Sequence, residues 1–210
     1  MNSSGINAIV FDLDGVLVDG EGWHEEAFVK AMADVGYDVT PDQKRKGYST
    51  LGRLKALARV GRAPKDFAPI AEAKQKYFKE IVDDRCRPVD RVISAVDFAH
   101  GFTNGKIAVA TNCSREPAIH MLTRAGLMPF FNVVITGDDT KGNLKPHPSP
   151  YLEASYGLGV FSKKCLAIDD SDIGIFSAVQ AMMRTLRIPR FDYLSAELIK
   201  KELKALEIRI

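Results

Sequence analysis

The amino-acid sequence predicts an α/β fold, in which helices flank a mostly parallel central sheet and an all-helical domain is inserted into the chain. Three observations support this prediction. Short apolar runs rich in β-branched residues recur along the 210-residue chain. Helical patterns alternate with these runs after about residue 90, as in α/β layer folds. The interval from about residue 18 to 87 contains helical patterns and no convincing strand.

Five short runs have the composition of strands. The first, Ile6–Phe11, is apolar and β-branched, as in strands that are buried on both faces, and it ends abruptly at Asp12. The others cover residues 106–110, 132–136, 165–168 and, more weakly, 185–188. Such runs joined by helices favour parallel pairing, because a parallel connection needs a crossover.

Helical patterns separate the later strands. Residues 116–125 and 173–183 carry apolar side chains at helical spacing, and residues 195–210 form a charged amphipathic pattern. Ser149 is a suitable cap and Pro150 suits the first helical position, which predicts a helix over 150–156.

The block from 18 to 87 contains three helical patterns, at residues 23–35, 51–60 and 67–82. The simplest interpretation is a helical cap domain at 18–87, inserted into a core made of residues 1–17 and 88–210. Helices packed directly on the sheet are the alternative that periodicity leaves open.

Composition excludes several classes of protein. Hydrophobic residues make up 46% and charged residues 27%, which is typical of globular rather than disordered chains. A net charge of +2 gives no reason to expect nucleic acid or a membrane surface as partner. Three cysteines without a C-x-x-C pair, and no signal peptide or membrane-spanning run, favour a reducing, cytoplasmic setting.

Polar residues follow three of the predicted strands at the point where each ends. They are Asp12 and Asp14 after the first strand, Thr111 and Asn112 after the second, and Asp169 and Asp170 after the fourth. Ligands of open α/β sheets bind beyond these carboxyl ends, so the six residues are candidates for one site. Crowded carboxylates repel one another unless a cation joins them, and hard oxygen ligands suit Mg²⁺. Lys145, in the loop after the third strand, suits a phosphate group.

Four motifs built on these residues resemble the haloacid dehalogenase superfamily, in its phosphatase and β-phosphoglucomutase-like branch. They are FDLDGVLVD at 11–19, ATNCS at 110–114, LKP at 144–146 and IDDSDIGI at 168–175. They occur in the family's order and at similar spacing, and the resemblance covers nearly the whole chain. It implies a Rossmann-like core with a helical cap.

The resemblance also implies roles for the acids. Asp12 would be the nucleophile that becomes an aspartyl phosphate. Asp14 would be the general acid and then the general base, with its backbone carbonyl joining Mg²⁺ coordination. Asp170 would be a further metal ligand, and Asp169 a neighbouring ligand or a carboxylate supporting the ligands.

Other matched positions would bind the substrate. Thr111 and the backbone of Asn112 would hold the oxygens of the transferred phosphoryl group, and Lys145 would neutralise that group and Asp12. In the block 18–87, His24 is a candidate for a hydrogen bond near the hinge or substrate, with packing as the alternative. Thr50 lies in a loop that resembles a specificity loop, at a position where related sugar-phosphate mutases carry arginine. Arg53 is a candidate substitute for that arginine, with a solvated surface position as the alternative.

The function expected from these residues is Mg²⁺-dependent hydrolysis of a small phosphorylated metabolite, of the sugar phosphate or phosphoglycolate type. The partner would then be that metabolite, and the protein a monomer or weak homodimer. A phosphomutase is the first alternative, and the missing arginine at Thr50 argues against it. A 2-haloacid dehalogenase would need neither Asp14 nor Asp170, and a non-catalytic binding protein would need none of the four motifs.

Overall fold

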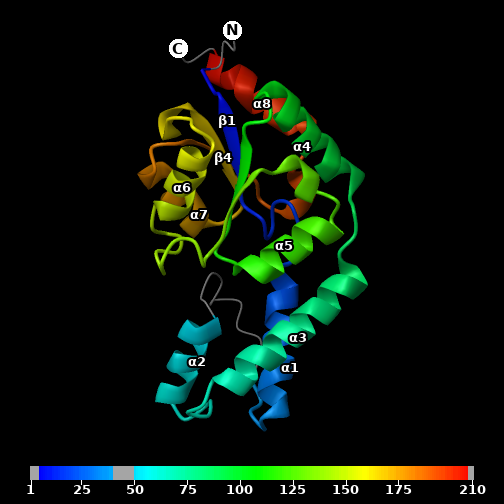
Figure 1. Cartoon of the computed structure of the whole chain (residues 1–210), viewed down its shortest axis with the longest axis vertical. Coiled ribbons are helices and arrows are strands. Elements are labelled where there is room, and N and C mark those ends of the chain that lie inside the picture. Colours follow the sequence, from blue (N-terminus) through cyan, green and yellow to red (C-terminus); the bar gives the residue numbers. More distant parts are fainter. Residues whose placement is uncertain (1–4, 40–49, 208–210) are drawn as a thin grey trace. The chain divides into compact units, whose positions relative to one another are not determined.

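The computed structural model describes residues 5–39 and 50–207 (Figure 1). The chain divides into two compact units: one joins the segment up to Asp19 with the segment from Arg87 onward, and the other runs from Gly20 to Cys86. None of the helices among the described residues is both long enough and apolar enough to cross a bilayer.

The first unit contains a five-stranded parallel sheet with the order β3-β2-β1-β4-β5, which confirms the predicted fold class. The strands are β1 Ala8–Phe11, β2 Ile107–Ala110, β3 Val133–Ile135, β4 Cys165–Asp169 and β5 Arg184–Arg187. In the central strand, Phe11 is in register with Val109 of β2 and Ile168 of β4. The chain therefore leaves β1, β2 and β4 at the same edge of the sheet.

Helices cover both faces of this sheet, α6 and α7 on one side and α4, α5 and α8 on the other (Figure 1). They are α4 Asp90–Phe102, α5 Arg115–Arg124, α6 Ser149–Gly157, α7 Asp172–Gln180 and α8 Ala196–Glu207. Short 3-10 helices follow at Met128–Phe130, Ser162–Lys164 and Phe191–Tyr193. Helix α7 ends earlier than the predicted 183, and Met182 beyond it has a left-handed backbone with φ 61°. Sequence reasoning missed α4.

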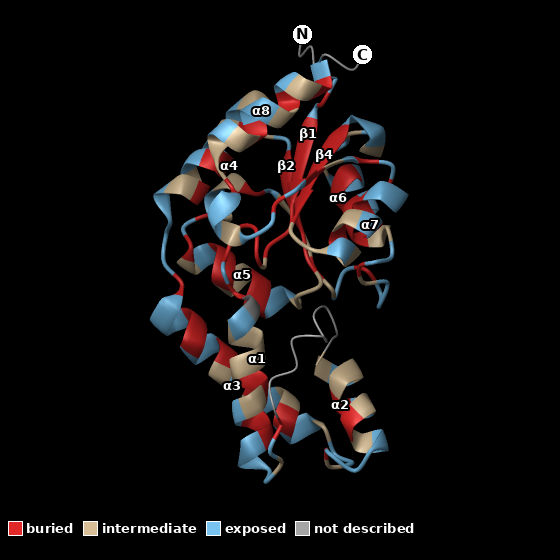
Figure 2. Ribbon diagram, turned by 180° about the vertical axis from the view of Figure 1, so that it is seen from behind, coloured by how far each residue is buried: buried red, intermediate tan, exposed pale blue. Residues whose placement is uncertain are grey.

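One core cluster of this unit lies between the sheet and α6 with α7 (Figure 2), and residues on the other face of the sheet, such as Ile9 and Ile107, are also buried. All four residues of β1 are buried, as are all four of β2. The strand residues that face these helices are small, including Ala8, Ala108, Ala110 and Ala167, and they pack with Tyr151 of α6. Small strand residues allow a large ring from α6 to lie close to the sheet.

The second unit consists of α1 Glu21–Asp34, α2 Thr50–Arg59 and α3 Ala68–Arg85. It has an apolar core of its own, in which Phe28 and Met32 of α1 pack with Leu54 of α2 and Ile70 of α3. Of the specificity-loop segment at 46–50, only Thr50 falls within the described residues.

Candidate active site

The first turn of the site follows β1. The backbone N–H of Asp12 donates to the Ile168 carbonyl at 2.9 Å, which continues the sheet to this residue. Gly15 then reverses the chain with φ +82°, a conformation that favours glycine. A Cβ at this position would overlap the Asp170 carboxylate, so the absence of a side chain lets the turn and Asp170 pack together.

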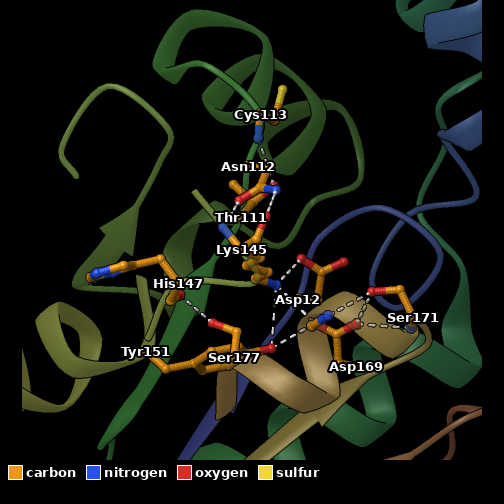
Figure 3. Close-up of polar contacts among 11 residues, drawn as sticks. Asp12, Thr111, Asn112, Cys113, Lys145, His147, Tyr151, Asp169, Ser171 and Ser177 are labelled. Atoms are coloured by element: carbon orange, nitrogen blue, oxygen red, sulfur yellow. Dashed lines mark hydrogen bonds and ion pairs between the residues drawn. The ribbon is translucent and has the colours of Figure 1, made fainter. Parts of the chain in front are cut away.

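The loop that carries Lys145 is tied to the end of β2 by the Asn112 side chain (Figure 3). The Lys145 backbone N–H donates to Asn112 Oδ1 at 2.7 Å, and Asn112 Nδ2 donates to the Lys145 carbonyl at 3.2 Å. Next to it, Thr111 Oγ1 accepts a hydrogen bond from the Cys113 N–H at 3.0 Å. The loop engages one hydrogen of the Asn112 amide. The Thr111 hydroxyl hydrogen, the backbone and the second amide hydrogen are the donors that this end of β2 can offer an oxyanion.

The ammonium group of Lys145 joins the ends of β1 and β4. Lys145 Nζ donates to Asp12 Oδ1 at 2.6 Å and to Asp169 Oδ2 at 2.8 Å. The side chain of Asp169 is 0% exposed, whereas that of Asp12 is 12% exposed. Only Asp12 of this pair therefore presents a surface that a bound molecule could reach.

Asp169 is held from the other side by the start of α7. Ser171 donates to Asp169 Oδ1 from its N–H at 2.9 Å and from its hydroxyl at 2.8 Å. The same hydroxyl accepts from the Gly174 N–H at 3.0 Å and so caps α7. A Cβ at Gly174 would overlap the Asp169 carboxylate, so the first helical turn lies directly against it.

Burial and charge shift the titration of these groups. Burial raises the pKa of Asp12 well above its ordinary value, although Lys145 acts in the opposite direction. Burial would lower the pKa of Lys145, but Asp12 and Asp169 together raise it. Burial would raise the pKa of Asp169, but Lys145 and hydrogen bonds from Tyr151 and Ser171 hold it below the ordinary value. One ammonium group thus faces two carboxylates, and further positive charge beside Asp12 would stabilise its anion.

The acids also have the arrangement of a cation site. Oxygen atoms of Asp12, Asp169 and Asp170 lie within 4.8 Å of one another. Carboxylate oxygens are ligands that Mg²⁺ prefers, so this donor set fits the metal expected from the sequence. The carboxylate of Asp14, two residues after Asp12, is not part of this group of three.

Comparison with known proteins agrees with this geometry. The family model described as haloacid dehalogenase-like hydrolase matches residues 9–188. This chain belongs to that family. The resemblance inferred from the four motifs is therefore confirmed.

Individual proteins are similar over most of the chain. Fructose-1-phosphate phosphatase YqaB of Escherichia coli is 27% identical over 83% of this chain and 92% of its own length. The crystal structure of β-phosphoglucomutase from Clostridium difficile has a TM-score of 0.79 and 25% identity, covering 97% of this chain and 99% of that one. Protein SUPPRESSOR OF QUENCHING 1 of Arabidopsis thaliana is 31% identical over 87% of this chain, but this chain spans only 18% of its length.

The structure brings together most of the residues that the sequence singled out in the first unit. Asp12, Lys145 and Asp169 are in direct contact, and Asp170 lies beside them. Asn112 contacts the lysine loop through its side chain, an interaction that the sequence did not predict.

Two candidate residues of the second unit, His24 and Arg53, contact other side chains of that unit. Lys74 Nζ lies 3.0 Å from His24 Nδ1, and the imidazole is stacked on Phe78 with ring centroids 4.0 Å apart. Arg53 forms a two-pronged ion pair with Glu25, and its guanidinium lies over the Phe28 ring at 4.0 Å. Thr50 is the first residue of α2 and is partly buried.

Sequence reasoning missed two residues of the site, Tyr151 and Ser171. The Tyr151 hydroxyl donates to Asp169 Oδ2 at 2.6 Å and accepts from Lys145 Nζ at 3.2 Å. Burial, reinforced by Asp169, raises the pKa of Tyr151 well above its ordinary value, so it stays a neutral donor. For Tyr151 the sequence offers one signal, a hydroxyl-bearing aromatic residue in the predicted 150–156 helix. Ser171 had the signal of a cap, a serine just before a helical pattern.

Proposed function

We propose that this protein is a Mg²⁺-dependent phosphatase that hydrolyses a small phosphorylated metabolite, of the sugar phosphate or phosphoglycolate type. The observation that carries the proposal is the contact of 2.6 Å between the buried Lys145 ammonium and Asp12, the one partly exposed carboxylate of the pair. An anionic nucleophile can approach an anionic phosphate only where fixed positive charge offsets their repulsion. The fructose-1-phosphate phosphatase relative supports the substrate class.

In this proposal the reaction has two steps at Asp12. Its carboxylate oxygen forms a bond to phosphorus as the bond to the leaving oxygen breaks, and Asp14 gives that oxygen a proton. Asp14 then takes a proton from water, which attacks the aspartyl phosphate and releases phosphate with Asp12 regenerated. Thr111, whose hydroxyl oxygen already accepts from the Cys113 N–H, would donate its hydrogen to a phosphoryl oxygen, together with the Asn112 backbone.

The metal would be held by Asp12 and Asp170 with the backbone carbonyl of Asp14, and Asp169 lies next to them. When bound, Mg²⁺ would supply further positive charge that neutralises the phosphoryl oxygens. The need for this cation also separates the proposal from a metal-free dehalogenase, in which Asp170 would have no such task.

We propose further that the helical unit acts as a cap that covers the substrate, with His24 and Thr50 on the substrate side. Arg53 is the weaker candidate for a phosphate clamp, because Glu25 already neutralises it. This pairing favours hydrolysis over a mutase reaction, which must grip a second phosphate. None of the three cysteines, all of which lie in the described part of the chain, is in a disulfide, and this supports the reducing, cytoplasmic setting that we propose.

A screen of phosphorylated metabolites with Mg²⁺, scored by phosphate release, tests the proposal. We expect turnover that EDTA stops and Mg²⁺ restores. Asp12→Asn, which keeps the side-chain shape, should abolish turnover with an unchanged circular dichroism spectrum, whereas the exposed control Asp192→Asn should not. Turnover that survives either EDTA or Asp12→Asn would contradict the mechanism.

The mutase alternative has its own test. The protein is incubated with a hexose 1-phosphate and a trace of the corresponding bisphosphate. Net isomerisation without phosphate release would establish the mutase reaction, and phosphate release without isomerisation is the result we expect.

A further inference from the structure

We propose that Tyr151 is a positioning residue, whose phenolic oxygen fixes the ammonium group of Lys145 on Asp12. The inference builds on the proposed function, because it assigns Tyr151 a role in the same reaction. Tyr151 would not touch the substrate. It would act through Lys145 and Asp169.

The hydrogen bonds at Lys145 use every donor of its ammonium group. An ammonium group has three N–H donors. They meet three acceptors, Asp12 Oδ1 at 2.6 Å, Asp169 Oδ2 at 2.8 Å and the Tyr151 hydroxyl at 3.2 Å. The lysine side chain is only 3% exposed, and its Nζ also lies 4.7 Å from the centre of the Tyr151 ring. Because lysine has a flexible stem and a rotating head, three fixed acceptors are what gives this group one orientation.

The carboxylate of Asp169 is likewise surrounded by hydrogen-bond donors. A carboxylate has about four acceptor positions. Asp169 receives four donors, two from Ser171 on Oδ1 and one each from Lys145 and Tyr151 on Oδ2. Its hydrogen-bonding capacity is therefore filled by the protein. We infer that Asp169 acts on Lys145, and that direct ligation of the metal falls to Asp12 and Asp170.

Tyr151 is itself held in place by packing. It is fully buried, and it belongs to the core formed with the small strand residues Ala8, Ala110 and Ala167. Pro150 in the first turn of α6 fixes the backbone just before it. The ring is thus positioned by packing, and the hydroxyl transmits that position to the ammonium group.

Removal of the hydroxyl would change two contacts at once. Lys145 would lose its third acceptor, and Asp169 Oδ2 would lose its neutral donor. The ammonium group would then be drawn more strongly to Asp169 and held less firmly on Asp12. The transition state, in which charge develops next to Asp12, would be affected more than substrate binding.

The experiment compares Tyr151→Phe with a matched control, Ser177→Ala. Ser177 is buried in the neighbouring helix and its hydroxyl donates to the His147 carbonyl at 2.6 Å, so the control also removes one buried hydroxyl but not one that touches Lys145. We measure kcat, KM, the melting temperature and the NMR signal of the Lys145 ammonium hydrogens in metal-free protein. Lys145→Arg assigns that signal by its disappearance.

We expect Tyr151→Phe to lower kcat by about fivefold to tenfold, in line with the loss of the hydrogen bond that holds the Lys145 ammonium, and to leave KM within about twofold. The ammonium hydrogens should exchange with water measurably faster than in the wild type and the control, whereas the melting temperatures of the two variants should be similar. A kcat within about twofold of the wild type, or an ammonium signal unchanged from it, would overturn the proposal.

The NMR readout separates this proposal from the proposed function. A wild type that hydrolyses no phosphate ester, but whose ammonium signal depends on Tyr151, would refute the function and support the positioning. Active wild-type protein with an ammonium signal insensitive to Tyr151→Phe would refute the positioning alone. If the variant does not fold, the wild type decides: a cross-peak between the Tyr151 hydroxyl hydrogen and the Lys145 ammonium hydrogens is expected, and its absence would refute the contact.

Discussion

Lys145→Met should leave two carboxylates facing each other without their cation. The lysine side chain is 3% exposed and donates to Asp12 at 2.6 Å and to Asp169 at 2.8 Å. Removal of one partner from a buried ion pair typically costs about 3–5 kcal/mol of unfolding free energy. For a chain of this size, that corresponds to a fall in melting temperature of roughly 6–20 °C.

The assay is thermal unfolding of metal-free protein, followed by circular dichroism at several pH values. In the wild type, Lys145 helps to hold the pKa of Asp169 below its ordinary value. In the variant, burial and mutual repulsion should raise the pKa of both carboxylates in the folded state. A group with a raised folded-state pKa stabilises the fold at low pH and loses that contribution as pH rises. The stability that the variant lacks relative to the wild type should therefore become smaller as the pH falls from about 8 to about 5.

Lys163→Met is the matched control, since Lys163 is exposed and its loss should change stability by no more than about 0.5 kcal/mol. A Lys145→Met protein that melts within about 2 °C of the wild type would refute the reasoning, because the two carboxylates would then not depend on the lysine. A deficit that grows toward low pH would refute the assigned sign.

Three further changes have defined outcomes. Gly15→Ala should lower the free energy of unfolding by about 1–2 kcal/mol through the left-handed backbone alone, as measured by urea unfolding. It should also displace Asp170 and so weaken Mg²⁺ binding in titration calorimetry, and an unchanged Mg²⁺ affinity would contradict the packing of Gly15 on Asp170. Asp170→Asn should weaken Mg²⁺ binding at least tenfold, about 1.4 kcal/mol, by calorimetry, and equal affinity would exclude it as a ligand. Arg53→Gln should destabilise the helical unit by about 1–3 kcal/mol through the loss of its charged hydrogen bonds to Glu25, with helix loss on urea unfolding as the readout; if phosphate-ester KM rises sharply with stability unchanged, Arg53 is a substrate clamp instead.

The fold was predictable because its signals are local. Each strand is a short apolar run, and each end of a strand is marked by a change to polar residues, as at Asp12 and Asp169. Helix α4 had an equally local signal, since Val92, Ala95, Val96 and Ala99 are all buried at helical spacing. This helix could therefore have been predicted from the spacing of its apolar residues.

The partners of the site residues were less predictable, because they are contacts across space. Lys145 is separated from Asp12 by 133 positions, and Arg53 from Glu25 by 28. Periodicity places a residue on a face of a helix or at the end of a strand, but it does not state which side chain it meets there. The resemblance to a family supplied the lysine and the acids, whereas Tyr151 and the pairing of Arg53 became visible only in the structure.

Gly15 and Gly174 leave room for Asp170, which follows β4, and for Asp169, the last residue of β4. Asp170 fills the space that a side chain at position 15 would take, and Asp169 fills the space that one at position 174 would take. The turn after β1 and the first turn of α7 thus leave two spaces, and one carboxylate occupies each of them. The absence of a side chain at these two positions is therefore as necessary to the site as the charged residues themselves. A substitution of either glycine would displace a carboxylate of the site although the number of acids stays the same.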